Sequence, residues 1–313
     1  MFDAIVCGGG PAGLAAALWL GRYRRKTLLL DSGEQRNLST GSAHGYLGLD
    51  TTSPAYILSA ARRDLDRYTT VEYSSQTALT LDRSGENFIV GLEETEHTAR
   101  RVVLATGVKD ALPDIPGFSD YYGRTIFHCS CCDGYEASEQ RVAAIGWASH
   151  AAGFALDLLE WGADVTLLTN GHRFEGGAAS EGALRKHEIE IIEEPVVSIQ
   201  GTGDRMAGLE LESGRILAAD RAFFSIAHEP RSELAASIGC AIDGAGYIEV
   251  DDHGQTNVEG IYAVGDVTPG EQLIQTAAAE GAVAGIACAM SLRGEYTSLE
   301  VPDPGPDPDK ELP

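Results

Sequence analysis

The sequence is poor in positive charge. Lys and Arg together number 23 against 47 Asp and Glu, which gives this chain of 313 residues a formal net charge of −24. Nucleic acids and anionic membranes are bound through basic surfaces, so we expect neither as a partner. The acidic surface is either an ordinary solvated surface or an adaptation to high salt, and stability measured across salt concentrations separates these two possibilities.

Cysteine is scarce and scattered. The six cysteines lie at positions 7, 129, 131, 132, 240 and 288. Secreted domains held by disulfides are short and dense in cysteine, so this class is excluded and we expect a cytoplasmic protein in a reducing compartment. Cys7, Cys240 and Cys288 lie in apolar stretches and are predicted to be buried core residues.

A long uninterrupted apolar segment is also missing. Residues 4–21 come nearest, but four glycines and Pro11 interrupt them, and charged residues follow the segment instead of preceding it. A signal peptide has the opposite order of charge, and a membrane-spanning helix needs about 20 apolar residues. We therefore predict a protein that is not inserted in a membrane.

The sequence does contain a dinucleotide-binding pattern near its start. Gly8-x-Gly10-x-x-Gly13 follows a predicted strand over residues 2–7 and opens a predicted helix. Gly8 permits the tight turn, Gly10 lets a pyrophosphate approach the backbone, and Gly13 lets the helix pack on the strand. Three further residues are expected at this site, two at the start of the helix and one after the next strand: Pro11, Ala12 and Asp31.

Two later segments favour FAD over NAD as the dinucleotide. Gly265 and Asp266 end a predicted strand and resemble the element that holds the ribityl chain in flavoproteins with two dinucleotide-binding domains. Residues 105–107, Ala-Thr-Gly, resemble the segment that lies midway along the same superfamily. Outside the glycine pattern, the predicted cofactor-binding residues are Asn37, Thr106, Gly107, Gly265, Asp266 and Gln272.

The segment Cys129-Ser130-Cys131-Cys132-Asp133-Gly134 contains a C-x-x-C pattern, whose two thiols can close a redox-active disulfide. We prefer Cys129 and Cys132 over the vicinal pair of Cys131 and Cys132. Asp133 either carries a proton for these thiols or caps a helix. His128 and the three cysteines are too close in sequence to surround one tetrahedral ion, so we predict no metal site.

The order of segments predicts an α/β fold with two Rossmann-like, three-layer ββα dinucleotide-binding domains, the second inserted into the first. Residues 1–115 and 243–300 are assigned to an FAD-binding domain. Residues 116–242 form an inserted domain that is similar to an NADPH domain and carries the C-x-x-C pattern. The Pro- and Asp-rich residues 301–313 cannot bury apolar surface and are predicted to be a disordered tail.

Together these segments resemble the low-molecular-weight thioredoxin reductase family over roughly residues 1–295. The resemblance implies that Cys132 is the thiol next to the flavin, that Cys129 attacks the partner disulfide, and that Asp133 is the acid/base. It also implies a homodimer. A thioredoxin-like protein or a small-molecule dithiol or disulfide is the implied substrate.

The second nucleotide site departs from that family. Where the family has G-x-G-x-x-A, residues 146–151 are Gly-Trp-Ala-Ser-His-Ala, so Ala148 replaces the middle glycine and Trp147 stands beside it. After the next strand the family has two arginines, and residues 169–171 here are Thr-Asn-Gly. The loss of both features argues against NADPH as the electron donor.

A closer match exists with a subgroup of this family. Arg36-Asn37, the loop at His44-Gly45 and the run that ends Asp-Gly-Tyr-Glu at residue 136 resemble the dithiol oxidases of gliotoxin and holomycin biosynthesis. Those enzymes pass electrons from dithiols through flavin to oxygen. Other relatives take electrons from ferredoxin, which is acidic and matches an acidic surface poorly at low salt. His44 is either a base near the flavin or a residue of a surface loop.

The sequence thus predicts an FAD-dependent thiol–disulfide oxidoreductase that exchanges electrons between the flavin and a Cys129–Cys132 disulfide without NADPH. Two alternatives stay open: an NADPH-dependent thioredoxin reductase with an atypical nucleotide site, and a flavin-bound redox sensor. The direction of electron flow is left open.

Overall fold

The chain divides into two compact units in this computed structural model, which describes residues 1–225 and 227–293. Unit 1 contains Met1–Ser32, Asp64–Thr106 and the chain from Ser232 onward. Unit 2 contains Gly33–Arg63 and Gly107–Arg231. The expected tail at residues 301–313 lies outside the described residues.

The unit boundaries differ from the predicted junctions at residues 115 and 243, which lie inside units 2 and 1 respectively. The segment after residue 107 stays with unit 2 because β7 (Val108–Ala111) pairs in antiparallel fashion with β16 (Ala227–Pro230). Gly33–Arg63, which the sequence assigned to the first domain, also groups with unit 2. These groupings depend on pairings between distant segments, which have no local sequence pattern.

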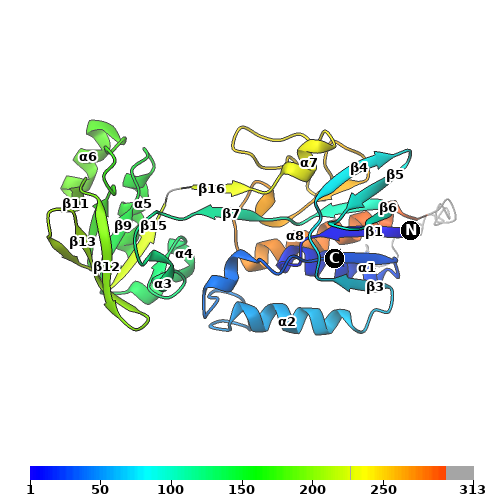
Figure 1. Cartoon of the computed structure of the whole chain (residues 1–313), viewed down its shortest axis with the longest axis horizontal. Helices are drawn as coiled ribbons and strands as arrows, with labels where there is room; N and C mark the ends of the chain where they lie inside the picture. The colour runs from blue at the N-terminus through cyan, green and yellow to red at the C-terminus, as the bar shows by residue number, and fades with distance from the viewer. Residues whose placement is uncertain (226, 294–313) are drawn as a thin grey trace, which may run out of the picture. The chain divides into compact units, whose positions relative to one another are not determined.

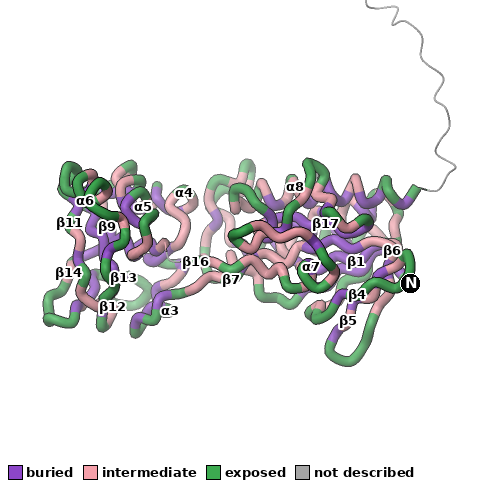
Figure 2. The backbone as a smooth tube through the Cα atoms, turned by 90° about the horizontal axis from the view of Figure 1, so that it is seen from above, coloured by how far each residue is buried: buried purple, intermediate pink, exposed green. Residues whose placement is uncertain are grey.

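Unit 1 is built on a seven-stranded sheet with the order β3-β2-β1-β6-β5-β4, in which β17 also pairs with β6 (Figure 1). The strands β1, β2, β3, β6 and β17 run parallel, and β4 and β5 are antiparallel. Five of the six residues of β1 are buried, as expected for a parallel strand covered on both faces (Figure 2). The strand bounds are β1 (Phe2–Cys7), β2 (Thr27–Leu30), β3 (Val71–Ser74), β4 (Thr80–Ser84), β5 (Asn87–Gly91), β6 (Glu96–Leu104) and β17 (Ile261–Ala263).

Two helices of unit 1, α1 (Pro11–Arg22) and α8 (Ile274–Ser291), pack closely along one another. A Cβ atom on Gly281 would lie 2.0 Å from the carbonyl oxygen of Ala12, and one on Gly285 would lie 2.7 Å from that of Ala16. The small residues of both helices therefore permit contact between backbones. The other helical segments of unit 1 are α7 (Glu233–Ser237) and η4 (Gly265–Val267), whereas η1 (Arg36–Ser39) belongs to unit 2 and α2 (Pro54–Leu65) begins in unit 2 and ends in unit 1.

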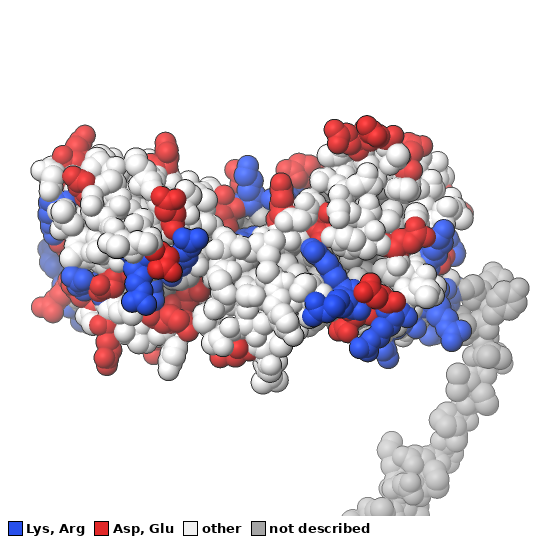
Figure 3. Space-filling model, turned by 60° about the horizontal axis from the view of Figure 1, so that its bottom comes forward, with Lys and Arg blue, Asp and Glu red and all other residues white. Residues whose placement is uncertain are grey.

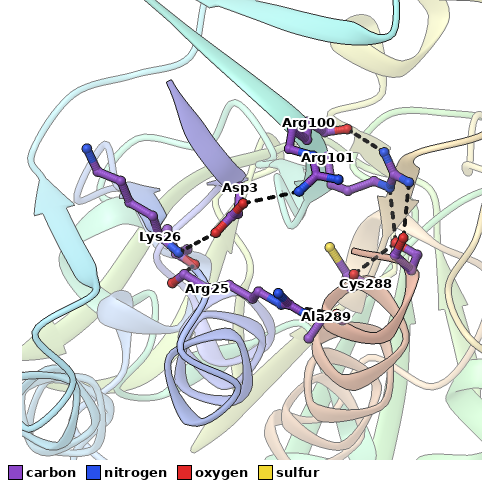
Figure 4. Close-up of polar contacts among 9 residues, drawn as sticks. Asp3, Arg25, Lys26, Arg100, Arg101, Cys288 and Ala289 are labelled. Carbon is purple, nitrogen blue, oxygen red and sulfur yellow. Dashed lines mark hydrogen bonds and ion pairs between the residues drawn. The ribbon is translucent and has the colours of Figure 1, made fainter. Parts of the chain in front are cut away.

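Arginine side chains bind the C-terminal end of α8 (Figure 4). Arg25 donates to the carbonyl oxygen of Ala289 at 2.8 Å, and Arg101 donates to that of Ser291 at 3.3 Å. The last carbonyl groups of a helix have no partner within the helix and carry partial negative charge, so guanidinium groups stabilise them. Cys288 lies within this cluster and is buried, as are Cys7 and Cys240, which confirms their predicted place in the core.

Unit 2 is built on a five-stranded parallel sheet with the order β11-β10-β9-β15-β8, and a three-stranded sheet follows with the order β12-β13-β14. The strand bounds are β8 (Ile126–Phe127), β9 (Arg141–Ile145), β10 (Asp164–Leu168), β11 (Glu190–Ile192), β12 (Val196–Thr202), β13 (Arg205–Leu211), β14 (Ile216–Ala218) and β15 (Arg221–Phe224). The helical segments are α3 (Phe118–Tyr121), α4 (Ser130–Asp133), η2 (Tyr135–Ala137), α5 (Ala151–Asp157), η3 (Leu158–Glu160) and α6 (Gly177–Lys186). The predicted α/β class with two Rossmann-like parts is confirmed.

None of the helices within residues 1–225 and 227–293 is long and apolar enough to cross a membrane.

Candidate functional site

The turn between β1 and α1 is formed by Gly8, Gly9 and Gly10, which have no side chains. Gly8 has a φ of +120°, and a Cβ atom on it would lie 2.0 Å from the carbonyl oxygen of Ala105. A Cβ atom on Gly13 would lie 1.8 Å from the carbonyl oxygen of Gly8. Larger residues at either position would displace the turn, which begins a helix with Pro11 in its first turn and no side-chain cap for its first backbone N–H groups. This geometry fits the pyrophosphate of a dinucleotide.

Asp31 lies beside this turn. It follows β2 and is almost fully buried, at 1% exposure, and its Oδ2 accepts a hydrogen bond from the Tyr73 hydroxyl at 2.8 Å. A Cβ atom on Gly9 would lie 2.1 Å from the Asp31 carboxyl carbon, so the carboxylate lies directly against the glycine turn. Tyr73 was not predicted. It reaches Asp31 because β3 pairs with β2, a long-range register that has no signal in the sequence.

Gly265 and Asp266 begin a turn after β17, and two side chains hold that turn. The Gly265 N–H donates to Glu280 Oε2 at 2.8 Å, and the Thr268 hydroxyl donates to the Gly265 carbonyl oxygen at 2.8 Å. Burial raises the pKa of Glu280 above its usual range. Glu280 was missed by the sequence reasoning, although it is the only acid on the otherwise apolar and small-residue helix α8.

The other predicted cofactor residues are distributed over both units. Thr106 belongs to unit 1, and Gly107 follows it in unit 2 with a φ of +67°. Gln272 donates to the Tyr247 hydroxyl at 3.2 Å. Asn37, in η1 of unit 2, has a buried Oδ1 with no hydrogen-bond partner among the residues described. A buried acceptor without a partner costs about 1–3 kcal/mol, and a bound ligand with a donor group would remove this cost.

A disulfide joins Cys129 and Cys132, with an S–S distance of 2.03 Å and a Cα–Cα distance of 5.3 Å. Cys129 is the N-cap residue of the short helix α4, and its Sγ accepts from the Cys132 N–H at 3.1 Å. The two sulfurs meet because residues three positions apart share one face of a helical turn. Cys131 is an exposed free thiol, so the vicinal pairing is absent from this structure.

Asp133 directly follows this disulfide and is buried at the end of α4. Burial, with a smaller contribution from Glu136, raises its pKa to about 7, and Arg221 opposes the shift. The N-cap position of α4 is held by Cys129, so Asp133 does not cap that helix. A carboxyl group with such a pKa can both take up and release a proton near neutral pH.

His44 lies beside the end of the same motif. Its Nδ1 lies 3.3 Å from Glu136 Oε1, and its side chain is 18% exposed. Glu136 Oε2 is buried and has no hydrogen-bond partner within the described part of the chain. The loop that carries His44 therefore contacts Glu136, three residues after Asp133, and the sequence did not predict this contact.

A chain of hydrogen bonds leads to His128, the residue before Cys129. Arg36 binds Asp110 through two contacts, Nε to Oδ2 at 2.8 Å and Nη2 to Oδ1 at 2.6 Å. The Tyr122 hydroxyl donates to Asp110 Oδ2 at 3.1 Å and lies 3.1 Å from His128 Nδ1. Burial, together with Arg36 and His228, lowers the pKa of His128 to about 4, so its ring is neutral at pH 7. The sequence considered His128 only as a metal ligand, and this chain of contacts was missed.

Two aromatic rings stack on one another at the loops where the second nucleotide was considered. The Trp147 and His172 rings stack with their centroids 3.9 Å apart and an angle of 17° between their planes. The Trp147 carbonyl oxygen accepts from the Glu175 N–H at 2.9 Å, which ties the two loops together. His150 Nε2 lies 3.3 Å from the Ser225 carbonyl oxygen at the end of the sheet. Within the described ranges, no group of three His, Cys, Asp or Glu residues is arranged to hold a metal ion.

Comparisons with known proteins agree with this geometry. The family model described as pyridine nucleotide-disulphide oxidoreductase matches residues 2–281. The chain is 30% identical over 297 residues to a protein named thioredoxin reductase tcpT from Claviceps purpurea, covering 90% of this chain and 92% of the relative. The crystal structure of HlmI superposes with a TM-score of 0.88 at 34% identity, covering 93% and 92% of the two chains. That of a putative thioredoxin reductase TrxB from Bacillus anthracis has a TM-score of 0.87 at 29% identity, covering 93% and 98%.

Proposed function

The chain belongs to the pyridine nucleotide-disulphide oxidoreductase family, and we propose that it oxidises a dithiol at Cys129–Cys132 and passes the electrons to an acceptor other than NADP⁺. Its predicted nature as a thioredoxin reductase-like, FAD-dependent disulfide oxidoreductase is confirmed. The proposal is carried by the Trp147–His172 stack, which joins the two loops where a second nucleotide was considered, together with the Cys129–Cys132 disulfide beside Asp133.

Thiol–disulfide exchange describes what the chain's own residues do. A substrate thiolate attacks Cys129 Sγ, the Cys129–Cys132 bond breaks, and Cys132 leaves as a thiolate. The second substrate thiol then attacks the mixed disulfide, which closes the substrate disulfide and releases Cys129. Asp133 accepts a proton from a substrate thiol and returns it to the Cys132 sulfur. Bound FAD supplies a two-electron acceptor for the reduced pair and an outlet to oxygen, so that a dithiol and oxygen yield a disulfide and hydrogen peroxide.

Unit 1 is assigned to FAD and unit 2 to the redox disulfide in this proposal. The bare glycine turn beside Asp31 supports the first assignment, and the position of the disulfide in α4 supports the second. A homodimer in the cytoplasm that acts on a thioredoxin-like protein or a small-molecule dithiol completes it. The free thiols of Cys7, Cys131, Cys240 and Cys288 fit a reducing compartment.

A second candidate is an NADPH-dependent thioredoxin reductase. The names of the similar proteins from Claviceps purpurea and Leptosphaeria maculans, thioredoxin reductase tcpT and sirT, favour it. In this case the nucleotide would have to bind beside Trp147 and His172, at a loop that has Ala148 in place of the family's middle glycine.

Anaerobic mixing of the purified, FAD-loaded protein with a dithiol, NADPH or NADH separates the two candidates. We expect the flavin absorbance to bleach with the dithiol alone and oxygen to be consumed when air is readmitted. Rapid bleaching by NADPH would overturn the proposal in favour of the reductase. Bleaching by dithiol without repeated turnover in air would indicate a redox sensor.

Substitution of one cysteine tests the route of the electrons. Cys132→Ser removes the thiol assigned next to the flavin, so we expect dithiols to lose the ability to bleach the flavin. Cys131→Ser is the matched control, because this exposed thiol lies outside the disulfide and its loss leaves bleaching unchanged. Normal bleaching in the Cys132 variant would show that the dithiol reacts elsewhere.

A further inference from the structure

We propose that His44 and Glu136 act as positioning residues that set the protonation of Asp133 beside the redox disulfide. This inference rests on the proposed function, in which Asp133 moves a proton between the substrate thiol and Cys132. Neither residue needs to touch the substrate. Their role is to control how readily Asp133 holds its proton.

The contacts around Glu136 carry this inference. Asp133 ends α4 and Glu136 lies in η2 directly afterwards, three positions along a continuous helical path, so their side chains share a face. One carboxylate oxygen of Glu136, Oε1, lies 3.3 Å from His44 Nδ1. The other, Oε2, is buried without a hydrogen-bond partner among the described residues. One oxygen of Glu136 is therefore positioned by His44, and the other acts on its buried surroundings.

Arg221 and Glu136 are the charged residues that act on Asp133, and His44 contacts Glu136. From β15, Arg221 is the cation that opposes Glu136, but burial and Arg205 lower its own pKa, and its Nη1 donates to the Arg124 carbonyl oxygen at 3.4 Å. From η2, Glu136 raises the pKa of Asp133 in addition to burial. The repulsion that Glu136 exerts depends on the position and hydrogen bonding of its carboxylate, and His44 contacts that carboxylate. His44 thus acts on Asp133 through Glu136.

The consequence for the chemistry follows from the proton balance. Asp133 must be ionised to take the proton of the substrate thiol and protonated to return it to the Cys132 thiolate. No proton is gained or lost by the side chain over the cycle. A group whose pKa lies near the working pH performs both proton transfers well. A pKa far from the working pH makes the overall transfer less efficient, because one of the two protonation states is then rare.

The test is the titration of Asp133 in the oxidised protein, followed by NMR of ¹³C-labelled aspartate carboxyl groups. Asp133→Asn identifies the Asp133 signal by removing it. Glu136→Gln removes a like charge, so we expect the Asp133 midpoint to fall by about one pH unit. His44→Gln removes the imidazole contact to Glu136 Oε1, so we expect a smaller rise of the Asp133 midpoint. In the double variant, the His44 change should have no further effect because its intermediary is gone.

Two controls use exposed residues of the same types, Glu139→Gln and His187→Gln, which should leave the Asp133 midpoint unchanged. The inference is overturned if Glu136→Gln leaves the midpoint in place, if both single variants shift it in the same direction, or if the two changes are additive. The titration requires neither dithiol nor turnover. It can therefore fail while dithiol oxidation succeeds, and it can succeed while dithiol oxidation fails.

Discussion

At the scale of single residues, the most consequential feature is a carboxyl group buried against a disulfide. Asp133 has little solvent and no direct ion pair among the described residues, and its neighbour Glu136 has the same sign of charge. Both effects favour the protonated form. Ionisation of Asp133 therefore destabilises the folded state. A buried carboxyl group with a raised pKa, next to a redox-active cysteine, is the pattern expected of a proton-transfer group.

The raised pKa of Asp133 makes a prediction about stability. A proton bound more tightly in the folded state stabilises it below the unfolded pKa, near 3.8, and this stability is lost as the pH rises through about 7. Asp133→Asn removes that dependence. We expect its free energy of unfolding to exceed that of the wild type at pH 8 by roughly 2–4 kcal/mol, with a smaller difference at pH 5.

Chemical denaturation at several pH values measures this difference. Asp157→Asn serves as a control, because this carboxylate is exposed. A constant difference between Asp133→Asn and the wild type from pH 5 to pH 8 would contradict the assigned titration.

At the scale of elements, contact between backbones explains the small residues of α1 and α8. Gly281 faces the carbonyl oxygen of Ala12 in the first turn of α1, the turn that begins at the glycines predicted to bind the dinucleotide. The helix that follows β17 therefore supports the same turn from the other side. Glu280, next to Gly281, fixes the Gly265 turn through its carboxylate. One helix thus positions two of the three segments assigned to FAD.

Gly281→Ala is expected to disturb both packing and cofactor binding. The added methyl group would lie 2.0 Å from the Ala12 carbonyl oxygen, so the helices must separate, at a cost of about 1–3 kcal/mol. Because the displaced backbone is part of the predicted FAD site, we expect weaker retention of FAD during gel filtration as well as a lower melting temperature.

Gly182→Ala is the matched control for that variant. Gly182 lies in α6, and a Cβ atom on it would have no neighbour within 4 Å. Alanine should therefore stabilise α6 by about 0.5–1 kcal/mol and leave the FAD content unchanged. Equal melting temperatures and equal FAD contents in the two variants would show that the close contact of α1 and α8 affects neither stability nor FAD binding.

At the scale of the whole molecule, charge is the dominant property. Acidic side chains are spread over the surface, and the fewer basic ones gather in groups (Figure 3). Several of the basic groups already have partners: Arg25 and Arg101 bind the end of α8, and Arg36 binds Asp110. The excess of 24 negative charges therefore repels itself in the folded state.

Salt should therefore stabilise the protein. Added salt screens this repulsion over a Debye length of about 10 Å at 0.1 M and about 3 Å at 1 M. We expect the melting temperature to rise steadily from dilute buffer to about 1 M sodium chloride, with potassium chloride as the control for ion-specific effects. Equal stability throughout would show that the acidic residues are far enough apart to be solvated independently, and would argue against adaptation to high salt.

Patterns confined to a few neighbouring residues were sufficient for much of this protein. The spacing of Gly8, Gly10 and Gly13 predicted the β1–α1 turn, because the conformations and close contacts that such a turn needs exclude side chains. The three-residue spacing of Cys129 and Cys132 favoured the disulfide that the structure contains. Three ordered segments indicated FAD and the α/β class.

The remaining features join residues that are far apart along the chain, and their partners became known only from the tertiary structure. Arg36 and Asp110 are 74 positions apart in the sequence, and His44 and Glu136 are also far apart in it. The short periods of helices and strands relate only nearby residues, so the sequence pattern does not predict either contact. The contact of His44 with Glu136 beside Asp133 and the stack of Trp147 on His172 both join residues from separate segments. Local chemistry thus identified the redox pair, whereas burial and distant charges, which depend on the folded chain, determine how its proton is held.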